Sequence, residues 1–146
     1  MITKTLIACV LVAATVSVHA IGLAQLLTSL LKSHALPPAR LWPITWFLIR
    51  ITWLLLLIHA TEITVWALFY WWQGCLPDLT SATYFSGVTY ATVGYGDLVL
   101  PIEWRMLAPI EGLTGILMCG LSTGLFFAIV NKLFGTPFEE DTSLEL

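Results

Sequence analysis

Three long apolar stretches limit what this chain can fold into more than any other feature of its sequence. They run from Leu6 to Leu31, from Ile51 to about Trp72 and from Met106 to Val130, and only Glu62 and Glu111 carry a formal charge within them. Each reaches the roughly 20 residues that a helix needs to cross a hydrocarbon core of about 30 Å. Only 10% of the residues are charged, against roughly 25% in soluble proteins. The sequence therefore predicts an all-α membrane protein with three transmembrane helices.

Charge and cysteine content exclude several other classes of protein. The net charge of -3 and an acidic C-terminal segment leave no basic surface for nucleic acid. Cys9, Cys75 and Cys119 are far apart and odd in number, so neither a disulfide framework nor a metal knot is expected. No cluster of Ser, His and Asp suggests an enzyme, and we expect no cofactor and no small-molecule substrate.

The distribution of Lys and Arg predicts the orientation in the membrane. The ends of the apolar stretches expected in the cytoplasm carry Lys32, Arg40, Arg50 and Lys132, whereas only Lys4 and Arg105 lie at the opposite ends. The positive-inside rule then places the N-terminus outside and the C-terminus in the cytoplasm. The run ending at Ala20 also fits a signal peptide, but cleavage there would leave the basic loop outside. We therefore expect a multi-pass protein of the plasma (inner) membrane in contact with lipid.

An irregular segment lies between the second and third apolar stretches. Residues 86–101 read SGVTYATVGYGDLVLP, with three glycines and a proline. Non-helical backbone at membrane depth is tolerated only where it is buried in protein or lines a watery path. Pro77 and Asp78 are good helix-start residues, so we expect a short helix over 78–91. Its carbonyl end would favour a cation next to it.

The sequence that follows this short helix, Thr92-Val93-Gly94-Tyr95-Gly96-Asp97, resembles the selectivity filter of potassium channels. Four copies of such a segment can replace the hydration shell of an ion with rings of oxygens, and glycines permit the positive φ angles that aim successive carbonyls at one line. The resemblance implies a homotetramer with K⁺ as the permeant ion. The ion-binding residues would be Thr92, Val93, Gly94, Tyr95 and Gly96, with K⁺ held by the carbonyls of Thr92, Val93, Gly94 and Tyr95 and by the Thr92 hydroxyl. Asp97 would add charge at the outer mouth or be an ordinary solvated carboxylate.

The resemblance also divides the chain into expected parts. An N-terminal transmembrane helix over 1–31, beyond the two spans of the minimal channel, is expected to lie against the outer helix. The other parts are a cytoplasmic loop over 32–43, a pore module over 44–134 and an acidic cytoplasmic tail over 135–146. Within the pore module we expect an outer helix over 44–72, a pore helix over 78–91, a filter over 92–96 and an inner helix over 104–134.

The side chains expected to support the filter differ from those of some bacterial relatives. Those relatives carry a glutamate four residues before the filter threonine, where this chain has Val88. An ionisable group inside a membrane is a functional hypothesis by default. We therefore expect Glu62 or Glu111 behind the filter, hydrogen-bonded to pore-helix hydroxyls. Either the carboxyl group supports conduction, or it makes a purely structural bond between helices. The candidate hydroxyls are those of Thr83, Ser86, Thr89 and Tyr90, and His59 is expected to pack against Glu62.

Glycines in the third apolar stretch have two interpretations. Gly115 lies close to where the family places its gating hinge, and Gly120 is a rival position. Small residues also permit close packing of helices, here against the outer helix. The sequence as a whole predicts a potassium-selective channel subunit. The alternatives are a weakly selective cation channel and a non-conducting accessory or sensor protein that keeps the pore fold.

Overall fold

Helices account for nearly all of the regular structure of this chain. The computed structural model describes residues 2–32 and 40–134, and within these residues there is no strand. The helices are α1 (Ile2–Lys32), α2 (Leu41–Trp72), α3 (Leu79–Tyr90) and α4 (Leu107–Phe134). α1, α2 and α4 are each long and apolar enough to cross a membrane. The prediction of an all-α membrane protein with three transmembrane helices is therefore confirmed.

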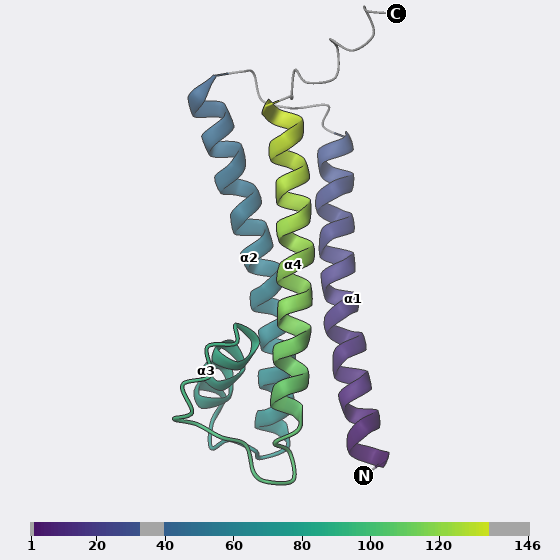
Figure 1. Cartoon of the computed structure of the whole chain (residues 1–146), viewed down its shortest axis with the longest axis vertical. Helices are drawn as coiled ribbons and strands as arrows, with labels where there is room; N and C mark the ends of the chain where they lie inside the picture. The colour runs from purple at the N-terminus through teal and green to yellow at the C-terminus, as the bar shows by residue number, and fades with distance from the viewer. Residues whose placement is uncertain (1, 33–39, 135–146) are drawn as a thin grey trace, which may run out of the picture.

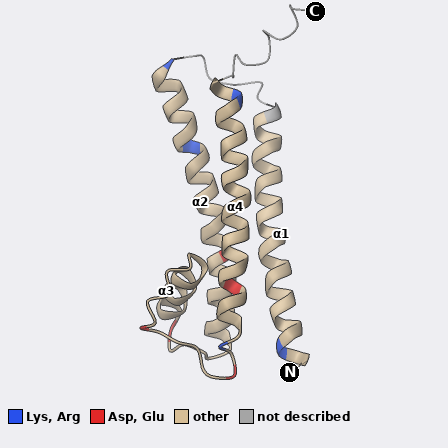
Figure 2. Cartoon of the chain, viewed as in Figure 1, with Lys and Arg blue, Asp and Glu red and all other residues tan. Residues whose placement is uncertain are grey.

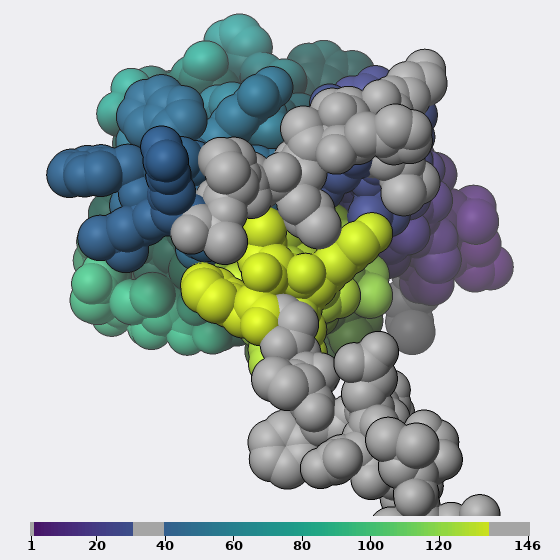
Figure 3. Space-filling model, turned by 90° about the horizontal axis from the view of Figure 1, so that it is seen from above, coloured from purple at the N-terminus to yellow at the C-terminus, as the bar shows by residue number. Residues whose placement is uncertain are grey.

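The three long helices lie side by side, and the short helix α3 packs beside one end of the bundle (Figure 1). The N-terminus of α1 and the loops around α3 lie at this end, whereas α1 and α4 both finish at the other end. α1 and α3 each pack against α2 and α4. Figure 3 looks down on the end where α4 finishes, and it shows α1 (purple) on the opposite side of the molecule from α3 (green). Charged residues are sparse along all three long helices (Figure 2).

Two helix starts differ from the sequence-based expectation. α2 begins at Leu41 instead of residue 44, because Pro43 lies in the first turn, where a missing N–H removes no helical hydrogen bond. α4 begins at Leu107 instead of residue 104, because the preceding residues form turns in which Trp104 N donates to Pro101 O at 2.8 Å. The expected pore helix agrees with α3 and its two caps. Most of the expected loop and all of the expected tail, residues 33–39 and 135–146, lie outside the described residues.

An aromatic cluster anchors α3 to the bundle. Trp66 and Tyr70 of α2 are fully buried, and the ring of Phe85 from α3 packs edge-on against Tyr70 with centroids 5.4 Å apart. α1 contributes Ala8 and Leu11 to the same cluster. Edge-to-face aromatic pairs add about 0.5–1.5 kcal/mol beyond the area that they bury. This end of the bundle therefore holds α3 against α2 and α4.

The buried side chains at the opposite end of the bundle are aliphatic, and Phe47 and Phe126 are among the partly buried residues packed against them. A second buried cluster there consists of Leu26 from α1, Ile51 and Leu55 from α2, and Ile129 from α4. Aliphatic contacts of this kind have no directional requirement, because the attraction depends on contact area alone. The two ends of the bundle are thus held by different kinds of contact, and the polar groups described next belong to the end that carries α3.

Candidate ion pathway and its polar support

A side-chain cap fixes the start of α3. The backbone N–H of Ser81 donates to Asp78 Oδ1 at 2.7 Å, and the Ser81 hydroxyl donates to Asp78 Oδ2 at 3.0 Å. These bonds hold the pKa of Asp78 below its usual range. α3 then runs for 12 residues and ends at Tyr90, with Ala91 as its C-cap. The carbonyl end of the helix, which carries partial negative charge, thus immediately precedes Thr92.

The segment after α3 has an alternating backbone conformation. Thr92, Gly94 and Gly96 have φ angles of 59°, 56° and 78°, whereas the intervening Val93 and Tyr95 do not have positive φ. Glycine adopts positive φ freely, but a β-branched residue such as threonine rarely does so. Thr92 therefore adopts a left-handed backbone conformation that is unfavourable for threonine and must be held by its surroundings.

Backbone hydrogen bonds at the end of α3 hold this conformation. The N–H of Thr92 donates to the carbonyl of Thr89 at 2.9 Å, and the N–H groups of Val93 and Gly94 donate to the carbonyl of Val88 at 2.9 and 3.3 Å. Val88 thus contacts the expected filter through its main chain, at the position where the resemblance led us to compare it with a glutamate of some bacterial relatives. These bonds engage the N–H groups of three successive residues and leave their carbonyls for other partners.

Large side chains of the expected filter are exposed in the single chain. Val93 is 52% exposed and Tyr95 is 72% exposed. A groove of about 420 Å³ runs beside this segment, between α3 and the first turns of α4. Val88, Thr92 and Leu113 are among the residues that line this groove. The segment therefore presents apolar surface that one chain does not cover.

Asp97 is tied back to α3. The Tyr84 hydroxyl donates to Asp97 Oδ2 at 2.8 Å, and this bond lowers the pKa of the Asp97 carboxyl. The exposed carboxylate thus links the end of the expected filter to the pore helix. Its role at the outer mouth stays a prediction.

Glu111 of α4 reaches the middle of α3. Its side chain is fully buried, Oε1 accepts a hydrogen bond from the Ser86 hydroxyl, and Oε2 accepts one from the Tyr70 hydroxyl at 2.8 Å. The Ser86 hydroxyl also lies 2.9 Å from the carbonyl of Ile63. A buried carboxyl group without partners would be costly, and here α2 and α3 each supply one to the carboxyl group from α4.

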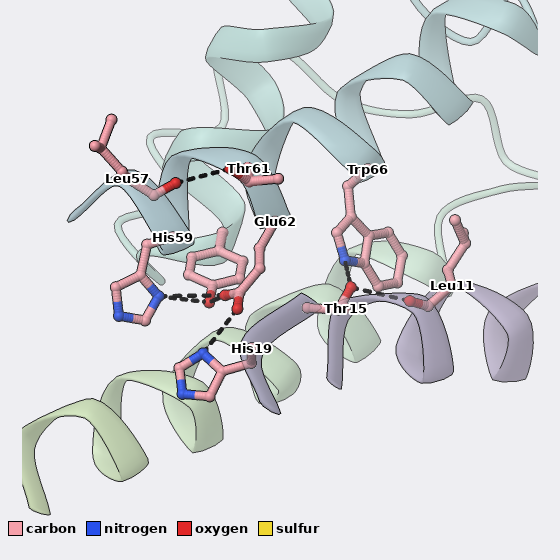
Figure 4. A network of polar contacts seen from close by, with 9 residues as sticks. Leu11, Thr15, His19, Leu57, His59, Thr61, Glu62 and Trp66 are labelled. Carbon is pink, nitrogen blue, oxygen red and sulfur yellow. Dashed lines mark hydrogen bonds and ion pairs between the residues drawn. The ribbon is translucent and has the colours of Figure 1, made fainter. Parts of the chain in front are cut away.

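Glu62 of α2 reaches the last residue of α3 and is also fully buried. Oε2 accepts a hydrogen bond from the Tyr90 hydroxyl and lies 3.2 Å from His59 Nδ1. Oε1 lies 2.7 Å from Nδ1 of His19, which comes from α1 (Figure 4). Of the four hydroxyls considered, those of Ser86 and Tyr90 thus meet the two carboxyl groups, whereas the Thr83 hydroxyl donates to Leu79 O within α3. The influence of either carboxyl group on conduction stays a prediction.

His19, His59 and Glu62 also form a set of residues that could hold a metal ion. One ligand atom of each lies within 4.8 Å of the others. The hydrogen bonds between them already engage both oxygens of Glu62 and the Nδ1 atoms of both histidines. Protein groups alone therefore satisfy these four atoms without an ion, whereas His19 Nε2 is buried and has no hydrogen-bond partner among the described residues.

The sequence comparisons agree with this architecture. A family model described as "Ion channel" matches residues 53–132, which is more than half of the chain. The chain belongs to this ion channel family. No curated protein and no solved structure matches the chain. The matched residues of the channel include Glu62, all of α3, the expected filter and most of α4, whereas α1 lies outside the match.

The two glycines considered as hinges of the channel have different surroundings. A Cβ atom at Gly115 would lie 2.2 Å from the carbonyl oxygen of Tyr90, whereas a Cβ at Gly120 would meet no atom within 4 Å. Gly112 also faces α3, since its Cβ would lie 3.4 Å from the carbonyl oxygen of Thr89. Close packing at Gly115 thus involves α3, not the outer helix α2 as the alternative interpretation held. Neither hinge assignment is tested by this geometry.

Three polar residues of the channel's site were missed by sequence reasoning. His19, Tyr70 and Tyr84 each donate to or contact one of the carboxyl groups described above. The only available signal was for His19, because a lone ionisable residue in an apolar stretch is itself a functional candidate. Tyrosines in apolar helices give no comparable signal, since most of them pack or lie at the membrane interface.

Proposed function

We propose that this channel conducts potassium selectively through a filter formed by Thr92 to Gly96 of four identical chains. The alternation of positive φ at residues 92, 94 and 96 carries the proposal, because it turns successive peptide groups so that their carbonyls can share one side of the chain. Carbonyl oxygens in stacked rings can replace the hydration shell of K⁺. The filter residues would bind the ion with backbone oxygens and with the Thr92 hydroxyl, and the chemistry is passive transport without catalysis.

The need for more than one chain follows from the rings of oxygens that surround an ion in such a filter. One chain contributes one filter segment, so rings of carbonyls require several copies arranged about a common axis. The exposed side chains of Val93 and Tyr95 support this arrangement, since neighbouring copies would cover them. α4 offers further exposed apolar side chains on the described chain, among them those of Leu113, Ile116, Leu117 and Leu121.

Rubidium uptake into vesicles that contain the purified protein tests the proposal. We expect uptake that barium blocks and that Gly94→Ala abolishes, because alanine is strained at a φ of 56° even though no atom lies within 4 Å of the new Cβ. Gly87→Ala is the matched control, since Gly87 has helical φ in α3 and its Cβ would also meet no atom within 4 Å. Uptake that Gly94→Ala leaves unchanged would reject conduction through this segment.

Weak selectivity among cations is the second candidate function. Val88 stands where some relatives have a carboxylate that braces the filter, and the only side-chain bond described here from α3 to the residue after the filter is that from Tyr84 to Asp97. Reversal potentials in mixed potassium and sodium solutions distinguish the two candidates. A potential near the potassium equilibrium value supports the selective channel, and a potential near zero in symmetrical total salt supports the weakly selective one.

We further propose that the loops around α3 face the outside of the plasma membrane. Arg40, Arg50 and Lys132 are distributed toward the end of the bundle at which α4 finishes, as the positive-inside rule requires of the cytoplasmic side. Single cysteines at Ile102 and at Arg40, in a chain without its natural cysteines, provide the test. Labelling of intact cells with an impermeant maleimide should reach the first site and spare the second.

A further inference from the structure

α1 makes two buried polar contacts with α2. They differ in whether the side chain contacted on α2 also forms a hydrogen bond with α3. Thr15 and His19 are almost fully buried, although they lie in an apolar helix. The Thr15 hydroxyl oxygen accepts a hydrogen bond from Trp66 Nε1 at 2.9 Å, and this contact ends in the aromatic cluster. His19 instead contacts Glu62, whose carboxyl group also contacts α3 (Figure 4). The contact through His19 is therefore part of a connection between α1 and the pore helix.

Three donors surround the Glu62 carboxylate. An ionised Glu62 only accepts hydrogen bonds, so in that state the Nδ1 atoms of His19 and His59 carry the protons of these contacts. His59 Nδ1 also lies 2.9 Å from the Tyr90 hydroxyl oxygen, which in turn donates to Glu62. Within an apolar medium each such bond lacks competition from water. The three donors therefore fix the position of both carboxylate oxygens together.

The ring of His19 depends on this contact for its orientation. Its Nε2 atom is buried and has no hydrogen-bond partner among the described residues. The bond from Nδ1 to Glu62 Oε1 is therefore the polar contact that orients the imidazole. Conversely, His19 is the donor described for Oε1, whereas Oε2 has two donors, from His59 and Tyr90. Loss of His19 would leave Oε1 without its described donor and so loosen the carboxyl group whose Oε2 contacts Tyr90.

Tyr90 lies two residues before the proposed filter, next to the residues whose carbonyls hold the filter backbone. It is the last residue of α3, and its carbonyl lies against Gly115 of α4. Its neighbours Thr89 and Val88 accept the hydrogen bonds from the N–H groups of Thr92, Val93 and Gly94. A shift of the Tyr90 side chain would therefore disturb the backbone that holds the left-handed conformation at Thr92.

We propose that His19 is a positioning residue for the selectivity filter, which it reaches through the Glu62 carboxylate and the Tyr90 hydroxyl, so that α1 sets the geometry of ion selection. The inference rests on the proposed function and deepens it, since it gives the helix outside the family match a task in selectivity. His19 itself contacts no part of the filter. α1 is thus coupled to the filter from the far side of the bundle.

Substitutions at His19 test this coupling through selectivity. His19→Leu removes the donor, and we expect the sodium-to-potassium permeability ratio from reversal potentials to rise about fivefold. His19→Asn places an N–H donor near the position of Nδ1 and should restore the ratio. His19→Gln keeps a polar group but places its donor farther from the backbone, and should not restore it. If His19→Leu fails to assemble, His19→Gln serves as the variant that lacks the donor at the position of Nδ1.

Thr15→Val is the matched control on the same helix. It removes the partner of Trp66 and so breaks a buried α1–α2 bond one turn away, without touching Glu62. Both Thr15→Val and His19→Leu should lower the thermal stability of the assembly, but only His19→Leu should change the permeability ratio. An equal change in both variants would mean that α1 acts through general stability, and it would overturn the proposal.

Hydrogen exchange separates failure of this inference from failure of the proposed function. The amides of Val93 and Gly94, bonded to Val88 in the described structure, should exchange faster in His19→Leu and at the original rate in Thr15→Val. If the wild type is potassium-selective and His19→Leu changes neither the permeability ratio nor the exchange rates, the role of His19 is rejected and the proposed function is not. A wild-type protein that shows no potassium preference would reject the proposed function, and the exchange measurement would still decide whether His19 holds the end of α3.

Discussion

Gly115→Ala should destabilise the channel because the space for a methyl group is occupied by main-chain atoms. The new Cβ would lie 2.2 Å from the carbonyl oxygen of Tyr90, 3.0 Å from its carbonyl carbon and 3.1 Å from its ring. Carbon and oxygen atoms normally approach to about 3.3–3.6 Å. α3 and α4 would therefore have to separate by roughly 1 Å at this contact. Backbone atoms cannot rotate away as a side chain can, so the shift must involve the end of α3.

Gly120→Ala provides the reference for the magnitude. Both substitutions lie inside α4 and gain the same roughly 1 kcal/mol of helix propensity, but no atom lies within 4 Å of a Cβ at Gly120. The difference between the two variants therefore isolates the steric cost, which overpacking places at about 1–3 kcal/mol per chain. We expect Gly115→Ala to be the less stable variant by this amount.

Unfolding in detergent measures this difference through intrinsic fluorescence. The chain has seven tryptophans, and Trp66 is fully buried in the cluster that holds α3, so its emission should report the loss of packing. The two midpoints should differ, with Gly115→Ala unfolding first. Coincident midpoints would show that α3 and α4 are not in close contact at Tyr90, and the reasoning about this contact would then be wrong.

Three further predictions concern the polar contacts and the hinge. Glu111→Leu leaves the Tyr70 hydroxyl without its acceptor and should lower the free energy of unfolding by about 1–3 kcal/mol. Glu111→Gln should lower it by less. A changed ion preference in Glu111→Gln would show that the carboxyl group acts on the proposed filter. Tyr84→Phe should raise the pKa of Asp97 toward its ordinary value, because the hydrogen bond from Tyr84 is the main cause of its lowering. The stabilisation from this bond is present above the ordinary aspartate pKa and is lost as the pH falls through the lowered value, so the wild type should keep its rubidium flux to lower external pH than Tyr84→Phe does. If Gly120 is the hinge, Gly120→Ala should reduce open probability in single-channel recordings without changing the permeability ratio, and unchanged gating would remove this assignment.

The sequence was sufficient to predict the helices and the place of the irregular segment. Apolar stretches of transmembrane length and the start signal at Asp78 are local patterns, and local patterns can be read from one chain. The expected start of the outer helix at 44 lies three residues after the observed start at Leu41, and a proline in the first turn, here Pro43, does not stop a helix. The resemblance of the segment from Thr92 to Asp97 to a potassium channel filter supplied the expected function. The match to the ion channel family agrees with the expectation of an ion channel.

For the buried carboxyl groups, the sequence predicted the chemical type of the partners but not which residue each group contacts. Glu62 and Glu111 were expected to meet hydroxyls of the pore helix, but which hydroxyl meets which carboxyl group depends on the rotation of each helix about its axis. Ser86 and Tyr90 lie four residues apart and therefore on the same face of α3. Sequence reasoning overlooked His19 because its partner lies 43 residues away, and no periodic pattern relates residues so distant.

The uneven placement of polar bonds along the bundle has a consequence for how the channel opens. The interhelical hydrogen bonds described above all lie in the half that carries α3, whereas Leu26, Ile51 and Ile129 pack the other half by apolar contact. Lipid chains can replace such contacts at little cost, because a membrane provides no hydrophobic force between helices. The ends of α1, α2 and α4 that lie away from α3 can therefore splay in lipid while the half that carries α3 stays together. An entrance that widens at those ends would leave the half with α3 unchanged.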